Sequence, residues 1–551
     1  MLLLLACTPA WEPPADAVLF EWDPRESLTS FPDDSLRAGG TIDLSDHAEA
    51  FEGLPETFTL VSALERLDGF GTTAAMTLRF KRAVPEDVQV RLMDTETGTE
   101  HEVELEWTDQ GETLLVRPWK PLQPSTEYLV TADGEGLYPS EVLHEVLYGR
   151  EDYEEHPGLA AVTTRLRELE VDAPAAALFT TQSLYTQDEE AADLIRSEEA
   201  PAIVLGDCAD EELVTLCDAS ITVLDFVPGT HLEGPVQLEG EYTLPVLLTL
   251  PRATEPRGVL IYGHGLGGDR GEARRIGRYL AEAGWAVAAI DAPRHGDHPT
   301  TTDSEDFFWI FQFFGLETSP QAFDVEQLRD NWRIATWDKL QLARALREGV
   351  EGALPADLPT VYAGHSLGGI MGVQLLAQDP DILAGELRVP GGRVSEIVER
   401  GETFSILVEL MSPSGTSDGD VARFFPMLQT AIERGDSANW AARVDQDLLV
   451  SMVLDDTIIP NSTTSLLARA LGLEHAPEVQ LDIGLPVSTE LPLSGNLDGR
   501  TALLYQFAVH WDEGEQSPAS HTHTFGSDSG VAQSLHYWST WPAPEVIDPL
   551  P

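Results

Sequence analysis

The stretch that decides the fold is Gly364-His365-Ser366-Leu367-Gly368. It follows the apolar residues 359–363, which predict a buried strand, and it precedes residues 369–376, which predict a helix. Glycines two positions before and after the serine permit the cramped strand-to-helix turn that lifts a serine out of a sheet. We therefore interpret Ser366 as a nucleophile; the alternative is a glycine-rich turn without chemistry.

A second glycine-rich turn, His264-Gly265-Leu266-Gly267-Gly268, follows the strand-like residues 258–262. A turn of this kind supplies one backbone N–H of an oxyanion hole, and the residue after the nucleophile supplies the other. The predicted donors are thus the amides of Leu266 and Leu367. The alternatives are a tight corner, or a phosphate site at the next helix N-terminus, for which the usual glycine patterns are missing.

With these two motifs in place, residues 220–545 resemble the α/β-hydrolases. Residues 285–291 read as another buried strand, the Asp291-to-Asp297 corner resembles the "D-x-P-x-H-G" turn of that fold, and residues 324–348 predict a long helix. Alternating strands and helices predict a doubly wound, mostly parallel sheet with lid insertions. The resemblance also implies that the acid and then the histidine of a catalytic triad follow the serine.

The predicted acid lies at the end of a strand, residues 447–454. The turn that follows, Asp455 to Pro460, resembles the "D-x-x-V-P" turn that carries the triad carboxylate in this fold, which implies Asp456. Asp455 is the alternative, because the end of a predicted strand is uncertain by a residue. A solvated acidic turn is the third possibility.

The predicted base lies between the last strand, residues 501–509, and the last helix. His523 is preferred, with His521 as the alternate, because both lie mid-loop in a segment that resembles the histidine corner of several hydrolases. His510 at the strand end and His536 in the helix are expected to make local structural contacts.

This set of residues implies acyl transfer through a Ser-Asp-His triad, with no metal or cofactor. The expected activity is that of a serine carboxylester hydrolase acting on lipid or other hydrophobic acyl esters. An amidase or polyester depolymerase with the same triad remains open, as does a non-catalytic surface binding protein on a degenerate fold.

The densest aromatic run lies between the corner and the long helix. It is interpreted either as a lid or acyl-pocket wall or as part of the core, with equal weight. Its predicted pocket residues are Phe307, Phe308, Trp309, Phe311 and Phe313.

The charge is extreme, with 94 acidic residues against 33 lysines and arginines, giving a net charge of −61. Such a charge argues against nucleic acid or an anionic bilayer as an electrostatic partner. It fits a soluble chain or saline surroundings equally well, and it leaves the oligomeric state open. The apolar content of 42% is enough for ordinary cores.

The first residues end in Leu4-Leu5-Ala6-Cys7, which resembles the lipobox of bacterial lipoproteins. That resemblance implies lipidation of Cys7 and a tether over residues 1–17, although the apolar stretch before Cys7 is shorter than a signal peptide. Cys208 and Cys217 are expected to form a disulfide in an oxidising compartment. The predicted location is the bacterial cell envelope, as an outer membrane lipoprotein.

Residues 18–182 alternate like a β-rich domain. Two stretches, residues 67–74 and 121–130, resemble the N-terminal Ig-like domain of the bacterial virulence-factor lipase family. The predicted organisation is a tether over 1–17, an Ig-like domain over 18–182, a linker with a disulfide loop over 183–219, and a catalytic domain over 220–551.

Overall fold

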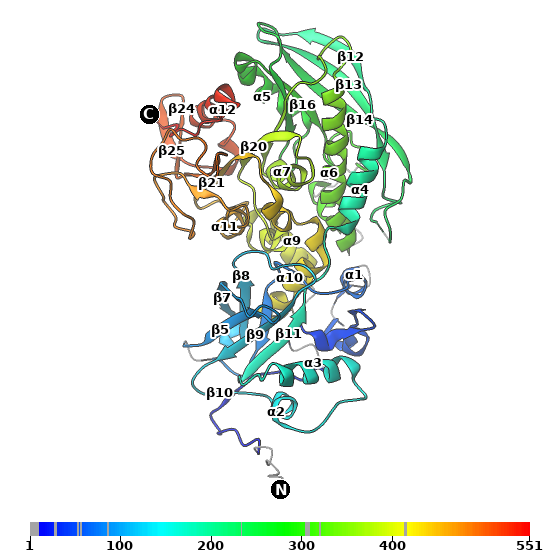
Figure 1. Cartoon of the computed structure of the whole chain (residues 1–551), viewed down its shortest axis with the longest axis vertical. Coiled ribbons are helices and arrows are strands. Elements are labelled where there is room, and N and C mark those ends of the chain that lie inside the picture. Colours follow the sequence, from blue (N-terminus) through cyan, green and yellow to red (C-terminus); the bar gives the residue numbers. More distant parts are fainter. Residues whose placement is uncertain are drawn as a thin grey trace. The chain divides into compact units, whose positions relative to one another are not determined.

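The computed structural model describes residues 10–26, 30–51, 54–55, 58–84, 87–232, 234–302, 309–318, 321–412 and 416–550 (Figure 1). The chain forms two compact units. The first comprises Met1–Leu184 and Met411–Glu433, and the second comprises Tyr185–Leu410 and Arg434–Pro551.

The first unit is β-rich, as predicted. Within the described ranges it contains two larger antiparallel sheets, of four and three strands. In sheet order these strands are β11 (Ala175–Thr180), β9 (Glu127–Asp133), β5 (Gln89–Asp94) and β6 (Glu100–His101), then β4 (Met76–Arg79), β8 (Thr113–Pro118) and β7 (Val103–Thr108). Shorter pairs join β1 (Val18–Leu19) to β10 (Leu137–Tyr138) and β2 (Arg37–Ala38) to β3 (Thr41–Ile42). The helices of this unit include α1 (Leu60–Glu65), α2 (Glu141–Tyr148), α3 (Pro157–Glu168) and α10 (Asp418–Ile432). An Ig-like relationship stays a prediction.

The segment Gly71 to Ala74 surrounds a buried carboxylate within this unit. Glu433, which follows α10, is fully buried and accepts hydrogen bonds from the backbone N–H groups of Thr73 (2.8 Å) and Ala74 (3.0 Å). The Thr72 and Thr73 hydroxyls also donate to it, at 3.1 and 3.0 Å. A buried carboxylate is tolerated only when it is paired in this way. The motif in residues 67–74 therefore serves, in part, to hold α10 in the first unit.

The second unit contains, among its described residues, a ten-stranded sheet. In order, its strands are β12 (Ile203–Asp210), β13 (Val214–Asp225), β14 (Gly240–Pro251), β16 (Trp285–Ile290), β15 (Gly258–Gly263), β19 (Thr360–His365), β20 (Ile382–Arg388), β21 (Asp447–Val453), β23 (Ala502–Phe507) and β22 (Glu474–His475). From β16 to β22 every pair is parallel, whereas β12, β13 and β14 join in antiparallel fashion. The prediction of a mostly parallel sheet is confirmed.

Helices cover both faces of this sheet, because successive residues of a buried strand point to opposite sides. In β15, Val259 and Ile261 pack into one apolar core, while Leu260 and Tyr262 pack into another. The first core takes in residues of α4 (Thr186–Ser197), α6 (Val325–Glu348), α7 (Leu367–Gln378) and α11 (Asn461–Ala470). The second takes in residues of α5 (Ala273–Leu280) and α12 (Asp528–Thr540). The remaining helices are α8 (Val394–Arg400) and α9 (Glu402–Met411). In the described part of the chain, no helix has both the length and the hydropathy to cross a membrane.

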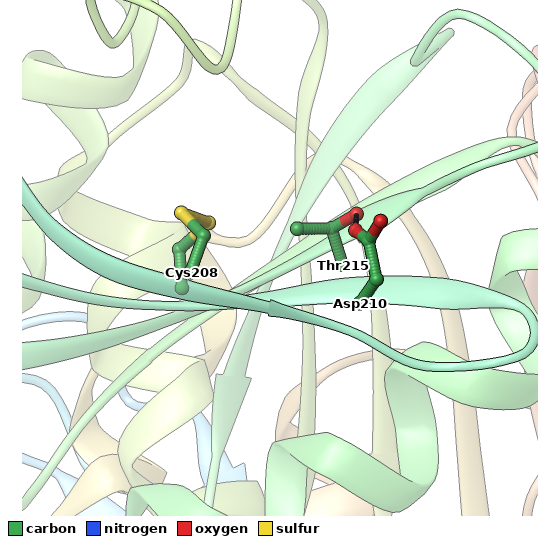
Figure 2. The surroundings of a disulfide bond; sticks show 4 residues. Cys208, Asp210 and Thr215 are labelled. Atoms are coloured by element: carbon green, nitrogen blue, oxygen red, sulfur yellow. Dashed lines mark hydrogen bonds between the residues drawn. A yellow bond between two sulfur atoms is a disulfide. The ribbon is translucent and has the colours of Figure 1, made fainter.

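The predicted linker over residues 183–219 is wrong. These residues form α4, the edge strand β12 and the first half of β13, all of which belong to the second unit. Cys208 and Cys217 are directly opposite one another in the β12–β13 hairpin and are joined by a disulfide (Figure 2). Close to it, the Thr215 hydroxyl donates to Asp210 at 2.7 Å. The residues of β12 are mostly solvent-exposed, as expected of a strand at the edge of a sheet.

Candidate active site

Ser366 occupies a sharp turn between β19 and α7. Its φ of 52° and ψ of −114° place a non-glycine residue in a strained backbone conformation. A Cβ on Gly364 would lie 2.4 Å from the carbonyl oxygen of Gly368, and one on Gly368 would lie 2.1 Å from that of Gly263. Both glycines of the motif are therefore required for close packing of the turn. The Ser366 residue is 5% exposed.

The turn at residues 264–268 lies beside Ser366. A Cβ on Gly265 would be 3.8 Å from the Cβ of Ser366. The Gly368 N–H donates to the His264 carbonyl at 3.0 Å, which ties this turn to the first turn of α7. Among the described residues, no acceptor is recorded for the N–H groups of Leu266 and Leu367. Two amide donors are thus left for a ligand oxygen.

The His264 side chain fixes this turn from within. The Ala292 N–H donates to Nε2 at 2.9 Å, so Nδ1 carries the proton and donates to the Gly265 carbonyl at 2.9 Å. Burial lowers the pKa of His264 to about 3, which keeps the ring neutral. His264 therefore anchors the turn to the corner after β16 rather than taking part in proton transfer.

Of the two candidate carboxylates, the structure brings Asp456 to a histidine. Its Oδ2 accepts from His521 Nδ1 at 2.7 Å, and its Oδ1 accepts from the N–H groups of Ile458 and Ile459 at 2.9 and 3.1 Å. The Asp456 side chain is 2% exposed. Asp455 is exposed, and its backbone N–H donates to Asn461. This is the arrangement expected of a carboxylate that orients an imidazole.

The structure brings the alternate, His521, rather than the preferred His523 to Asp456. His521 is buried against Asp456, whereas His523 is exposed and has Nδ1 3.5 Å from Ser520 Oγ. Residues 521–523 form a 3-10 helix, which completes a turn every three residues. Side chains two positions apart therefore point about 120° away from each other around the helix axis and do not face the same carboxylate.

The other two histidines make the local contacts that were expected of them. His510 Nε2 lies 3.2 Å from the Ser520 carbonyl oxygen, and its Nδ1 lies 3.3 Å from Ser527 Oγ. His536 Nε2 lies 2.8 Å from Glu545 Oε2.

His365, the residue before the serine, has a role that the sequence reasoning missed. Its Nε2 lies 2.9 Å from the His521 carbonyl oxygen and must donate, because a carbonyl oxygen only accepts. Burial, followed by the charge of His521, lowers the pKa of His365 to about 4. A neutral His365 thus clamps the loop that carries His521 to the residue next to Ser366. The sequence feature that could have indicated this contact is the histidine next to the serine in the Gly-x-Ser-x-Gly motif.

The described part of the aromatic run packs close to the turn at residues 264–268. Phe311, Phe313 and Phe314 are buried, and Ile310 Cγ2 would lie 3.5 Å from a Cβ on Gly267. The Phe313 ring lies 4.8 Å from that of Trp332 in α6, and the Phe314 ring lies 5.0 Å from that of Phe404 in α9. Phe307, Phe308, Cys7 and the Trp309 side chain lie outside the described residues. Ile310 thus borders the candidate oxyanion turn, and the aromatic rings that follow it in the chain pack against α6 and α9.

Comparison with known proteins places the fold. Residues 258–385 match the family model described as alpha/beta hydrolase fold. No curated protein matches the chain. The resemblance to virulence-factor lipases has no counterpart among these matches and stays a prediction.

Solved structures with low sequence identity match the chain. Acetyl xylan esterase 1 from Thermoanaerobacterium sp. is 15% identical, with a TM-score of 0.38, over 61% of this chain and 87% of that chain. A cold-adapted esterase from an Arctic intertidal metagenomic library is 16% identical, with a TM-score of 0.31, over 61% of this chain and 97% of that chain. From the family match and the parallel sheet, the second unit has an α/β-hydrolase fold, preceded in the chain by a β-rich region.

Proposed function

We propose that this protein is a serine carboxylester hydrolase with Ser366 as nucleophile, His521 as general base and Asp456 as the carboxylate that orients the base. The observation that carries the proposal is the 2.7 Å contact between His521 and a buried Asp456, with the His521 loop bonded to His365, the residue before a serine held at positive φ. Buried carboxylate–imidazole pairs next to a strained serine are the geometry that acyl transfer requires.

In the proposed reaction, Ser366 Oγ attacks the ester carbonyl carbon while His521 Nε2 takes the hydroxyl proton. His521 Nδ1 is committed to Asp456, so Nε2 is the nitrogen left for this transfer. The Leu266 and Leu367 N–H groups stabilise the oxyanion. Collapse breaks the bond to the alcohol, which leaves with the proton from His521, and water then releases the acid by the same steps.

The preferred substrates are proposed to be hydrophobic acyl esters. The support is the apolar segment near the candidate oxyanion turn, where Ile310 borders Gly267 and the Phe313 ring lies 5.6 Å from that of His295. Each methylene of an acyl chain that such a wall buries contributes about 0.8 kcal/mol. We expect kcat/KM for p-nitrophenyl esters to rise from acetate to octanoate. A higher kcat/KM for acyl amides than for all esters, in the same assay, would instead identify an amidase.

We also propose that the chain is an envelope lipoprotein with an Ig-like first unit. The support is the lipobox-like sequence before Cys7, the disulfide in the second unit, and the two antiparallel sheets of the first. Replacing Cys7 by serine should move the full-length protein from the membrane fraction to the soluble fraction, because the lipid chains are then missing. Equal membrane recovery of both forms would remove the anchor from the proposal.

A further inference from the structure

The midpoint of α6 carries a buried lysine that the proposed reaction does not use. Lys339 is 1% exposed. Its Nζ donates to the Ala335 carbonyl at 3.2 Å and approaches Met371 Sδ at 3.7 Å. Among the described residues, no carboxylate forms an ion pair with this ammonium. A buried cation without a paired anion is costly and calls for an explanation.

Two carboxylates, those of Asp338 and Asp291, act electrostatically on Lys339, and both already accept hydrogen bonds from other donors. Asp338 accepts from the Tyr242 hydroxyl at 2.6 Å and from His298 Nε2 at 3.1 Å. Asp291 accepts from the backbone N–H groups of Arg270 (2.7 Å) and Asp297 (2.8 Å), and it pairs with the Arg270 guanidinium. Arg270 pairs with Asp291, whereas the charge of Asp338 offsets part of the field of Lys339.

Lys339 lies on the side of α6 that packs against α7. Met371 belongs to α7, which lies beside α6 and begins directly after Ser366 (Figure 1). The rise of 1.5 Å per residue puts Met371 about 7.5 Å along α7 from the serine. Trp332, two turns before Lys339 on the same face of α6, contacts Phe313.

The charge of Lys339 reaches the oxyanion turn itself. Burial is the main cause of the lowered pKa values of His264 and His295, and the charge of Lys339 adds a smaller contribution, after those of His295 and His298 respectively. The His264 and His295 rings lie 5.1 Å apart, and His264 begins the turn that carries Leu266. A positive charge disfavours protonation of His264. By the same electrostatic field it favours a negative charge on an oxygen held by the turn that His264 begins.

We propose that the buried ammonium of Lys339 is an electrostatic residue of the active site, which stabilises the oxyanion through the protein interior without touching the substrate. This inference rests on the proposed function. The charge develops only in the transition state, so Lys339 raises kcat and leaves KM unchanged. The N-terminal end of α7, whose dipole is also positive, acts in the same direction.

The proposal predicts a particular dependence of kcat on pH. Burial lowers the pKa of Lys339 to about 8, against the opposing pull of Asp338 and Asp291. The other titratable groups that face it are Tyr242, His264, His295 and His298. Lys339 carries its positive charge below about pH 8 and loses that charge as the pH rises through this value. The kcat should therefore fall above pH 8.

The test compares Lys339→Met, which keeps the length of the side chain and removes the charge, with Lys120→Met. Lys120 is exposed in the first unit, so its replacement makes the same change in net charge away from the site. We expect Lys339→Met to lower kcat about tenfold with KM within twofold, and to abolish the fall in kcat above pH 8. Lys120→Met should match the wild type.

A purely structural Lys339 gives a different result: Lys339→Met is less stable in urea, but the folded fraction keeps its kcat and its pH profile. That outcome overturns the inference. If Lys339→Met does not fold, the wild type decides, because a kcat that stays flat from pH 7 to 10 is incompatible with it. Wild-type protein that neither hydrolyses esters nor reacts with a fluorophosphonate contradicts the proposed function instead.

Discussion

Replacing His521 by alanine should lower kcat for a p-nitrophenyl ester by about 10⁴-fold or more. Without the imidazole, nothing takes the proton of Ser366 Oγ during attack, and the carboxylate of Asp456 loses the ring that it orients. The loss should appear in kcat rather than KM, because the base acts in the transition state. Steady-state kinetics on folded protein, checked by circular dichroism, measure it.

His523→Ala is the matched control, since it removes an identical side chain two residues away. His523 is exposed, so we expect kcat within about threefold of wild type and an unchanged melting temperature. A crippled His523→Ala beside a nearly normal His521→Ala would reverse the assignment. Equal, small losses in both variants would remove this loop from the reaction.

The turn around Ser366 could be predicted because its chemistry is local. Only glycine fits at positions 364 and 368, where the backbones of β15, β19 and α7 approach within van der Waals contact. The strand before and the helix after the motif follow from short runs of apolar residues. The same holds for the turn at residues 264–268, so both motifs could be placed on the sheet from the sequence.

The choice between His521 and His523 could not be made in the same way. It depends on the direction in which each side chain leaves a short 3-10 helix, and three residues carry no periodicity to read. It also depends on tertiary contacts. The loop is fixed by the His365 clamp and by Phe525, whose ring lies 6.3 Å from that of His365 and 5.3 Å from the buried Arg388 guanidinium.

The place of residues 411–433 in the first unit could not be predicted for a related reason. Residues 411–433 are inserted in the catalytic part of the chain yet fold with the first unit. What holds them is a set of hydrogen bonds from Thr72, Thr73 and Ala74 to Glu433, about 360 positions away in sequence. Composition and periodicity report local structure, and a contact at this separation leaves no local trace.

The second unit contains a buried ion pair that could not be predicted from the net charge of −61. Arg388 is fully buried, pairs with Glu386, and accepts from the Ser366 N–H at its carbonyl oxygen at 2.9 Å. Glu386 accepts in turn from Ser534 (2.5 Å) and from Trp538 in α12 (2.7 Å). The strand residue whose carbonyl holds the Ser366 N–H thus also ties α12 to the sheet through a buried ion pair, so breaking that pair should destabilise the fold.

Replacing Ser366 by alanine should abolish turnover, with kcat reduced by about 10⁵- to 10⁶-fold. The oxygen that forms the acyl bond is missing, while the two amide donors remain and support only slow attack by water. Reaction with a fluorophosphonate probe should disappear as well, because that probe marks only an activated nucleophile. Alanine is the suitable variant, since it meets the same strain at a φ of 52° as serine does, whereas glycine would relieve it.

Ser451→Ala provides the matched control. Ser451 lies in β21, is fully buried, and has a hydroxyl for which no hydrogen-bond partner is recorded among the described residues. Its removal therefore takes away a hydroxyl from the same sheet without breaking a side-chain hydrogen bond among the described residues, and kcat should stay within about twofold. Ser366→Ala protein that keeps its fold and retains turnover within tenfold of wild type would exclude Ser366 as the nucleophile. In that case the strained turn and the His521–Asp456 pair would not carry out the reaction, and the residues that do would lie elsewhere in the chain.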